Sequence, residues 1–109
     1  MSVKGDVFMR LFVFFDLPVT TKKERQLATR FRKMLIKDGY QMLQFSVYCR
    51  ICKGQDVVDK HLNRLQVVTP KNGNIRALQV TDKQYARMRL LVGTIKKEEI
   101  IGVKQLVLF

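Results

Sequence analysis

The sequence has 109 residues, of which 47% are hydrophobic and two are proline, a composition typical of one globular domain rather than a disordered chain. Lysine and arginine number 21 against nine acidic residues, so the formal net charge is +12. Such an excess favours nucleic acid as the partner, because clustered cations release phosphate counterions on binding. No apolar run reaches the ~20 residues that span a bilayer, and Asp6 interrupts the N-terminus where a signal peptide would be apolar. We therefore expect a cytoplasmic protein without membrane contact.

The first predicted element is a strand over residues 8–16, which ends before Pro18, a residue that cannot extend a β-ladder. Side chains alternate along a strand, so both faces of this one would be largely apolar. One face would carry Phe8, Arg10, Phe12, Phe14 and Asp16, and the other Met9, Leu11, Val13 and Phe15. A chain this short lacks the helices to cover both faces of a sheet. We therefore expect a second copy of the chain to cover one face, in a homodimer.

A helix is predicted over residues 22–37, because Thr21 and Glu24 match a capping box and Asp38-Gly39 supplies a stop. Seven basic residues and one acid lie in this range. Cations in a first helical turn oppose the helix dipole, so their presence there suggests a use other than local stability. We expect phosphate contact by Lys22, Lys23 and Arg25, while a merely solvated helix face is the simpler alternative.

Farther along the chain, the β-rich run over residues 40–52 is too long for one strand and predicts two strands with a break near residues 44–46. A second helix begins around residues 54–56 and ends before the turn at residues 70–74. A strand at 75–81, a helical turn at 83–87 and a short strand at 89–92 follow. A mobile loop over 93–102 and an apolar strand at 105–109 close the sequence.

This order predicts a single α+β domain over residues 1–109, ferredoxin-like βαββαβ with extra C-terminal strands. Residues 94–109 would form a loop and strand that pack on a partner subunit. Cys49 and Cys52 form a C-x-x-C pattern, but residues three apart in a strand face opposite sides and no second pair completes a zinc site. His61 falls on the apolar stripe of the second helix and is expected to be a packed side chain rather than a ligand or base.

Asp16 is the acidic residue best placed for chemistry, because it ends the central strand beside a rigid turn. A twofold axis near its face would bring two Asp16 carboxylates together, and a divalent cation would relieve their repulsion. Mg²⁺ suits such oxygen ligands and can activate water. The alternative is that Asp16 caps the turn before Thr20. The aromatic first strand also suits an RNA-recognition motif loosely, but the strand at 75–81 has no aromatic residue to complete that signature.

Four segments of the chain, taken in order, carry a resemblance to a known family. They are Phe14-Phe15-Asp16-Leu17-Pro18, Gln44-Phe45-Ser46-Val47-Tyr48, Pro70-Lys71-Asn72-Gly73-Asn74-Ile75 and Val80-Thr81-Asp82-Lys83-Gln84-Tyr85-Ala86-Arg87-Met88. Together they resemble CRISPR-associated protein two, and more narrowly the form found in type II systems. The resemblance covers nearly the whole chain.

The resemblance implies a homodimer of ferredoxin-like subunits with facing sheets, whose C-terminal strands reach across to the partner. In the family, such a dimer bridges two dimers of the CRISPR integrase, and the complex inserts short double-stranded DNA into the CRISPR array as a new spacer. The DNA contacts implied for this chain position phosphates without reading sequence. They are Lys22, Lys23 and Arg25, followed by Arg30, Lys33 and Lys37.

The resemblance also matches Asp16 to the metal ligand of the family, whose members have been described as Mg²⁺-dependent endoribonucleases or DNases. Two hypotheses therefore stay open. The first is a non-catalytic scaffold in a DNA-integrating complex, and the second is an endonuclease with a metal site at the dimer interface.

Overall fold

The computed structural model describes residues 7–93, and this range contains four strands and three helices. They are β1 (Phe8–Asp16), α1 (Lys22–Lys37), β2 (Gln41–Gln44), β3 (Val47–Lys53), α2 (Gln55–Val68), β4 (Asn74–Thr81) and α3 (Asp82–Ala86). The first six have the predicted order βαββαβ. The α+β ferredoxin-like prediction is therefore confirmed for one chain.

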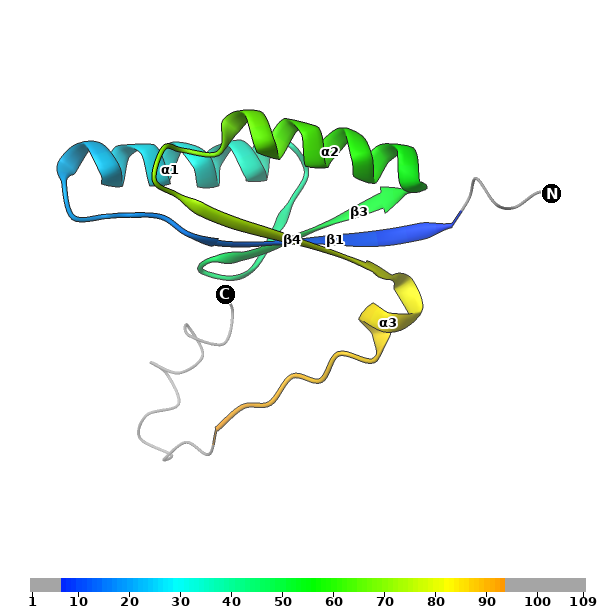
Figure 1. The fold of residues 1–109 in the computed structure, drawn as a ribbon. Coiled ribbons are helices and arrows are strands. Elements are labelled where there is room, and N and C mark those ends of the chain that lie inside the picture. The colour runs from blue at the N-terminus through cyan, green and yellow to red at the C-terminus, as the bar shows by residue number, and fades with distance from the viewer. Residues whose placement is uncertain (1–6, 94–109) are drawn as a thin grey trace.

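The four strands form one antiparallel sheet in the order β2-β3-β1-β4, with β1 in the interior. Helices α1 and α2 lie on one face of this sheet, and α3 lies on the other (Figure 1). The two crossovers through α1 and α2 place β1 between β3 and β4, which is why β1 carries the most apolar sequence. We call the face that α1 and α2 leave uncovered the open face.

Helix α1 begins and ends for local reasons. The Thr21 hydroxyl accepts a hydrogen bond from the backbone N–H of Glu24 at 3.0 Å, and the Glu24 carboxylate accepts one from the N–H of Thr21 at 2.9 Å. This is the predicted capping box. After the C-cap residue Asp38, the chain leaves the helix through Gly39, whose φ of +94° is one that residues with a Cβ rarely adopt.

The predicted break in the β-rich run is also confirmed. A tight turn at Phe45 and Ser46 separates β2 from β3, and the register between Met42 and Gln44 is irregular. The N–H of Phe15 donates to the Ser46 carbonyl oxygen at 3.1 Å, so the turn is bonded to the end of β1.

The core lies between the sheet and the two long helices. Leu11, Val13 and Phe15 point from β1 into it, which confirms the alternation predicted for this strand. The Phe15 ring meets the edge of Phe31 from α1 at a centroid distance of 5.1 Å. The other members come mainly from α1, α2, β3 and the segment between α1 and β2, and include Ala28, Leu35, Tyr40, Tyr48, Cys52, Val58 and Leu65. Helices α1 and α2 thus complete a single hydrophobic core on one face of the sheet.

On the open face, α3 covers only one end of the sheet. The Arg10 guanidinium stacks over the Tyr85 ring at 4.0 Å and donates from Nε to Asp82 Oδ1 at 2.9 Å. Beyond this contact Phe8, Ile51 and Leu78 stay largely exposed. Arg10 of β1 is the pairing partner of Ile51 on β3, and Phe12 is the pairing partner of Leu78 on β4. These side chains therefore share the open face. The described chain therefore leaves an apolar sheet surface without cover.

The predicted strand at residues 89–92 is wrong, and the predicted C-terminal elements cannot be compared with the described residues. Residues 89–92 form no strand: they follow α3 away from the sheet with their side chains exposed. A strand needs a neighbour for its backbone groups, and the path of the chain after α3 brings this segment beside none (Figure 1). The predictions for residues 94–109, a loop and a strand on a partner subunit, fall outside the described residues.

Candidate nucleic-acid interface

The solvent-facing side of α1 carries a row of basic side chains. They are exposed, and their spacing places them opposite the buried side of the helix at Ala28, Phe31 and Leu35. Among residues 7–93, none of them forms an ion pair. We call this row the basic ridge; it consists of Lys22, Arg30, Lys33 and Lys37.

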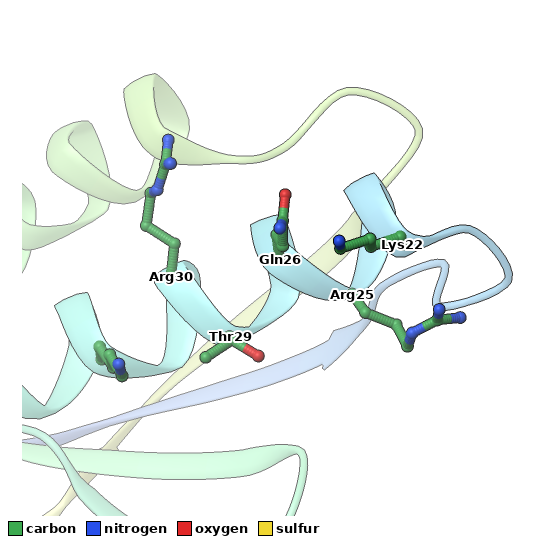
Figure 2. Close-up of a pocket in the computed structure, with 6 residues that line it drawn as sticks. Lys22, Arg25, Gln26, Thr29 and Arg30 are labelled. Carbon is green, nitrogen blue, oxygen red and sulfur yellow. The ribbon is translucent and has the colours of Figure 1, made fainter.

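A helix rises ~1.5 Å per residue, so the ridge extends over roughly 22 Å. Each strand of a DNA duplex carries a phosphate about every 3.4 Å along its axis, so roughly six phosphates fit this length. A shallow pocket of about 470 Å³ runs along the same side of α1 (Figure 2). Besides cations, its lining includes Gln26 and Thr29, two neutral side chains that can donate hydrogen bonds. The ridge therefore offers charge and hydrogen-bond donors together, at the spacing of a helical turn.

Arg25 has a different place from the ridge, although the sequence groups it with Lys22 and Lys23. Its guanidinium turns toward the loop before the helix (Figure 2) and donates from Nη1 to the carbonyl oxygens of Val19 at 3.2 Å and Thr20 at 3.0 Å. Glu24 bonds the same loop by accepting from the N–H of Thr20 at 2.9 Å. Arg25 therefore holds the loop that follows β1, which spacing alone does not show. Lys23 is exposed on the first turn.

Asp16 lies exposed at the end of β1, on the open face and opposite Asn74 of β4. Among residues 7–93, Glu24 and Arg25 bond the turn before Thr20 and the Asp16 side chain does not, so the alternative that Asp16 caps this turn is wrong. Residues 7–93 contain no cluster of three or more His, Cys, Asp or Glu side chains that could hold a metal ion. Mg²⁺ takes six oxygen ligands, and the described part of one protomer offers no group of acidic side chains here beyond Asp16. A metal site at Asp16 thus needs ligands from a second copy, water or substrate.

The two cysteines and the histidine are structural. Cys49 points to the open face and Cys52 to the helices, as predicted, and both are buried free thiols. Burial raises the pKa of each thiol, which disfavours the reactive thiolate. His61 is buried, as predicted, but its Nδ1 lies 3.3 Å from Oδ2 of Asp38, a neighbour that the sequence did not reveal.

A contact between Arg32 and Phe45, which the sequence also did not reveal, lies on the flank of α1. The Arg32 guanidinium stacks over the Phe45 ring at 3.9 Å from the ring centroid. The two residues lie 13 positions apart, on a helix and a turn, so no local pattern joins them. Their only signal in the sequence is an aromatic residue inside a predicted tight turn.

Among residues 7–93, no helix is both long and apolar enough to cross a membrane. The ferredoxin-like sheet, its open face and the exposed basic helix define a small, basic α+β domain. Comparison with known proteins identifies the family of this domain. The chain belongs to the CRISPR associated protein Cas2 family, whose family model matches residues 9–88.

Curated relatives agree with this membership over most of the chain. The chain is 49% identical to the CRISPR-associated endoribonuclease Cas2 of Acidovorax ebreus over 102 residues, which are 93% of this chain and 100% of that protein. It is 47% identical to the protein of the same name from Campylobacter jejuni, over 89% of this chain and 68% of the relative. For Flavobacterium psychrophilum the identity is 42%, over 91% and 86%. The chain thus belongs to a family of proteins that are associated with CRISPR systems.

Proposed function

We propose that this protein is a dimeric scaffold of CRISPR adaptation, which binds double-stranded protospacer DNA and bridges integrase subunits for insertion into the CRISPR array. The observation that carries the proposal is the basic ridge: four exposed cations on one side of α1, without an ion pair among the described residues. Family membership supports the CRISPR context.

The chemistry of the ridge favours phosphates over bases. Lysine carries a point charge on a long stem, which suits a phosphate but does not distinguish base edges. Three of the four ridge residues are lysines. The ridge is also straight and lies on the outer surface of one helix, so it can follow a backbone without entering a groove. Binding on this surface would therefore be strong at low salt and indifferent to sequence.

The dimer of this proposal uses the open face. Phe8, Ile51 and Leu78 expose apolar surface there, and a second copy of the chain would bury it by placing sheet against sheet. The ridge lies on the opposite layer, so it would remain free in such a dimer (Figure 1). The proposed dimer would then carry two basic ridges on its outer surfaces, where a scaffold could hold a duplex.

The test is the salt dependence of duplex binding. Replacing Lys22, Arg30 and Lys33 by alanine should reduce the slope of log K against log salt by ~0.9 for every phosphate that the variant no longer neutralises. Lys60 and Lys71 are exposed outside α1, and their double alanine variant is the control, with the change in slope compared per charge removed. An unchanged slope in the ridge variant, or an equal reduction in the control, would remove the ridge from the DNA surface.

The second candidate function is a Mg²⁺-dependent endonuclease centred on Asp16. The names of the relatives, which are endoribonucleases, favour it. Asp16 is exposed on the open face, so a dimer could bring two carboxylates to one cation, and Mg²⁺ would supply an activated water there. Asp16 would hold the metal, and the loop bonded by Glu24 and Arg25 would fix its position.

Replacing Asp16 by asparagine separates the two functions, because the amide keeps the shape and removes the charge. The nuclease hypothesis expects metal-dependent cleavage of RNA or DNA to vanish, while Asp56→Asn, an exposed acid of α2, cleaves as the wild type. Spacer acquisition that persists in cells carrying Asp16→Asn would assign the main role to the scaffold. Acquisition that fails while the complex still assembles on DNA would assign it to a metal-dependent step.

A further inference from the structure

Three side chains form a stack of two cation–π contacts at the flank of α1. The guanidinium of Arg32 lies over the Phe15 ring, at 5.3 Å from its centroid, and over the Phe45 ring, at 3.9 Å from its centroid. Arg32 also donates from Nε to the backbone carbonyl oxygen of Phe45 at 3.5 Å. Phe15 belongs to the buried core, so the stack begins in the core and ends at the surface with Phe45.

The outer end of this stack is open. Phe45 is 65% exposed, more than any other aromatic residue among residues 7–93. Arg32 already covers one side of its ring, so the exposed surface includes the other side. The ring is also held in place, because the turn that carries it is bonded to β1 through Ser46 and Phe15. An aromatic ring that is fixed on one side and free on the other is a ready surface for stacking.

The position of the stack relates it to the basic ridge. Arg32 belongs to the same helix as the ridge and is the direct neighbour of Lys33 in the chain. Thr29, which lines the pocket beside the ridge, lies one helical turn before Arg32. Arg32 therefore connects the Phe45 ring to the helix on which the phosphates of a bound nucleic acid would lie.

We propose that Phe45, backed by Arg32, is a stacking site for an unpaired nucleobase next to the duplex-binding ridge. Every base has a π-face, so the site would bind any unpaired base without reading sequence. A paired base inside a duplex has both faces covered by its neighbours and could not use it. The site would therefore recognise the junction at which a duplex opens into single strand. This inference rests on the proposed DNA-binding function and adds a second kind of contact to it.

The simpler role for the pair is to fasten the β2–β3 turn to α1 through cation–π attraction. That role needs the covered side of the ring and leaves the exposed side unexplained. An apolar contact with a partner protein would use the exposed side too, but the charge of +12 and the adjacent ridge favour a nucleic acid. The variants below distinguish these roles.

The experiment compares two DNA probes with the full-length protein over one series of salt concentrations: a blunt duplex, and the same duplex with a short thymine overhang. Phe45→Leu keeps an apolar side chain in the turn but removes the ring. We expect it to weaken binding of the overhang duplex about fivefold or more, while binding of the blunt duplex and its salt slope stay unchanged. Phe45→Trp should restore the difference. With 5-iodouracil in the overhang, irradiation should crosslink the wild type at Phe45.

Three results would overturn the stacking site. The first is equal binding of both probes by Phe45→Leu and wild type, and the second is an equal loss on both probes, which would mean that the ring only fastens the turn. The third is normal DNA binding without assembly on the integrase partner, which would make Phe45 a protein contact. The ridge variant offers the independent check: an unchanged salt slope there contradicts the proposed function, whereas an overhang effect confined to Phe45 concerns the stacking site alone.

Discussion

Oδ2 of Asp38, the C-cap residue of α1, lies 3.3 Å from Nδ1 of His61 in the middle of α2. The other oxygen of Asp38 accepts a hydrogen bond from Arg64 at 2.8 Å, and its backbone carbonyl accepts one from Arg50 at 2.9 Å. The Tyr40 hydroxyl lies 3.2 Å from the same Nδ1. The carboxyl end of α1 is therefore joined to α2 and β3 through one residue.

This arrangement makes stability depend on pH. Burial lowers the pKa of His61, and the charge of Arg50 lowers it further, against the raising effect of Asp38. The imidazole thus stays neutral in the folded protein at a pH at which it already takes up a proton in the unfolded chain. Because the unfolded state then binds more protons, we expect the free energy of unfolding to fall as the pH decreases through ~6.5.

Urea unfolding of wild type and His61→Gln between about pH 8 and about pH 5 measures this effect. Other titrating groups contribute equally to both proteins, so the difference between the two curves isolates His61. The difference should shrink as the pH falls. Parallel curves would show that His61 does not titrate between the two states.

The capping box predicts a stability change at the start of α1. Thr21→Ala removes the acceptor for the Glu24 N–H and should reduce the free energy of unfolding by ~1 kcal/mol, whereas Thr21→Ser should retain most of it. Thr20→Ala is the matched control, because only the backbone N–H of Thr20 bonds to Glu24. Chemical denaturation of the four proteins gives the comparison, and equal losses at both positions would argue against the cap.

Gly73 is predicted to be sensitive to substitution, because its surroundings leave no room for a side chain. A Cβ at this position would lie 2.6 Å from Cδ2 of Leu17 and 3.1 Å from the carbonyl oxygen of Pro70. Gly73→Ala should therefore displace Leu17 and lower the free energy of unfolding by roughly 1–3 kcal/mol. At Gly93 no atom of residues 7–93 lies within 4 Å of the added atom, so Gly93→Ala should unfold at the wild-type midpoint. A tolerated Gly73→Ala would mean that Leu17 moves aside freely.

The open face predicts a change in oligomeric state. Leu78 is 52% exposed on β4, so Leu78→Asp should leave the fold of a single chain intact. In a dimer built on this face, the aspartate would be buried beside its symmetry mate and the dimer should dissociate. Sedimentation of wild type and variant measures the mass, and circular dichroism checks the fold. A dimeric Leu78→Asp protein would place the interface on another surface. Lys71→Asp, on the loop before β4, is the control for charge.

The fold was predictable where short-range rules decide it. The capping residues at Thr21 and Glu24 and the stop at Gly39 gave α1 its bounds, and alternation along β1 separated Leu11 and Val13 from the open face. The strand at residues 89–92 was not predictable in this way, because apolar composition indicates a strand only when a neighbour is available to pair with it.

The candidate site was predictable in charge but not in geometry. The number of cations between residues 22 and 37 is evident in the sequence, whereas the separate roles of Arg25 and Arg32 depend on the loop and turn that each one meets. These partners come from other elements of the fold. Helical spacing can place a cation on a face, but it cannot tell a free guanidinium from one that is already bonded.

The bonds from Glu24 and Arg25 to the loop after β1 have a mechanical consequence. Both residues belong to the helix that carries the basic ridge, and the loop they hold begins directly after Asp16 and Leu17. A displacement of the first turn of α1 would therefore be passed through this loop to the end of β1. In this way a change on the helical layer, where the ridge lies, could reach Asp16 on the opposite face of the sheet.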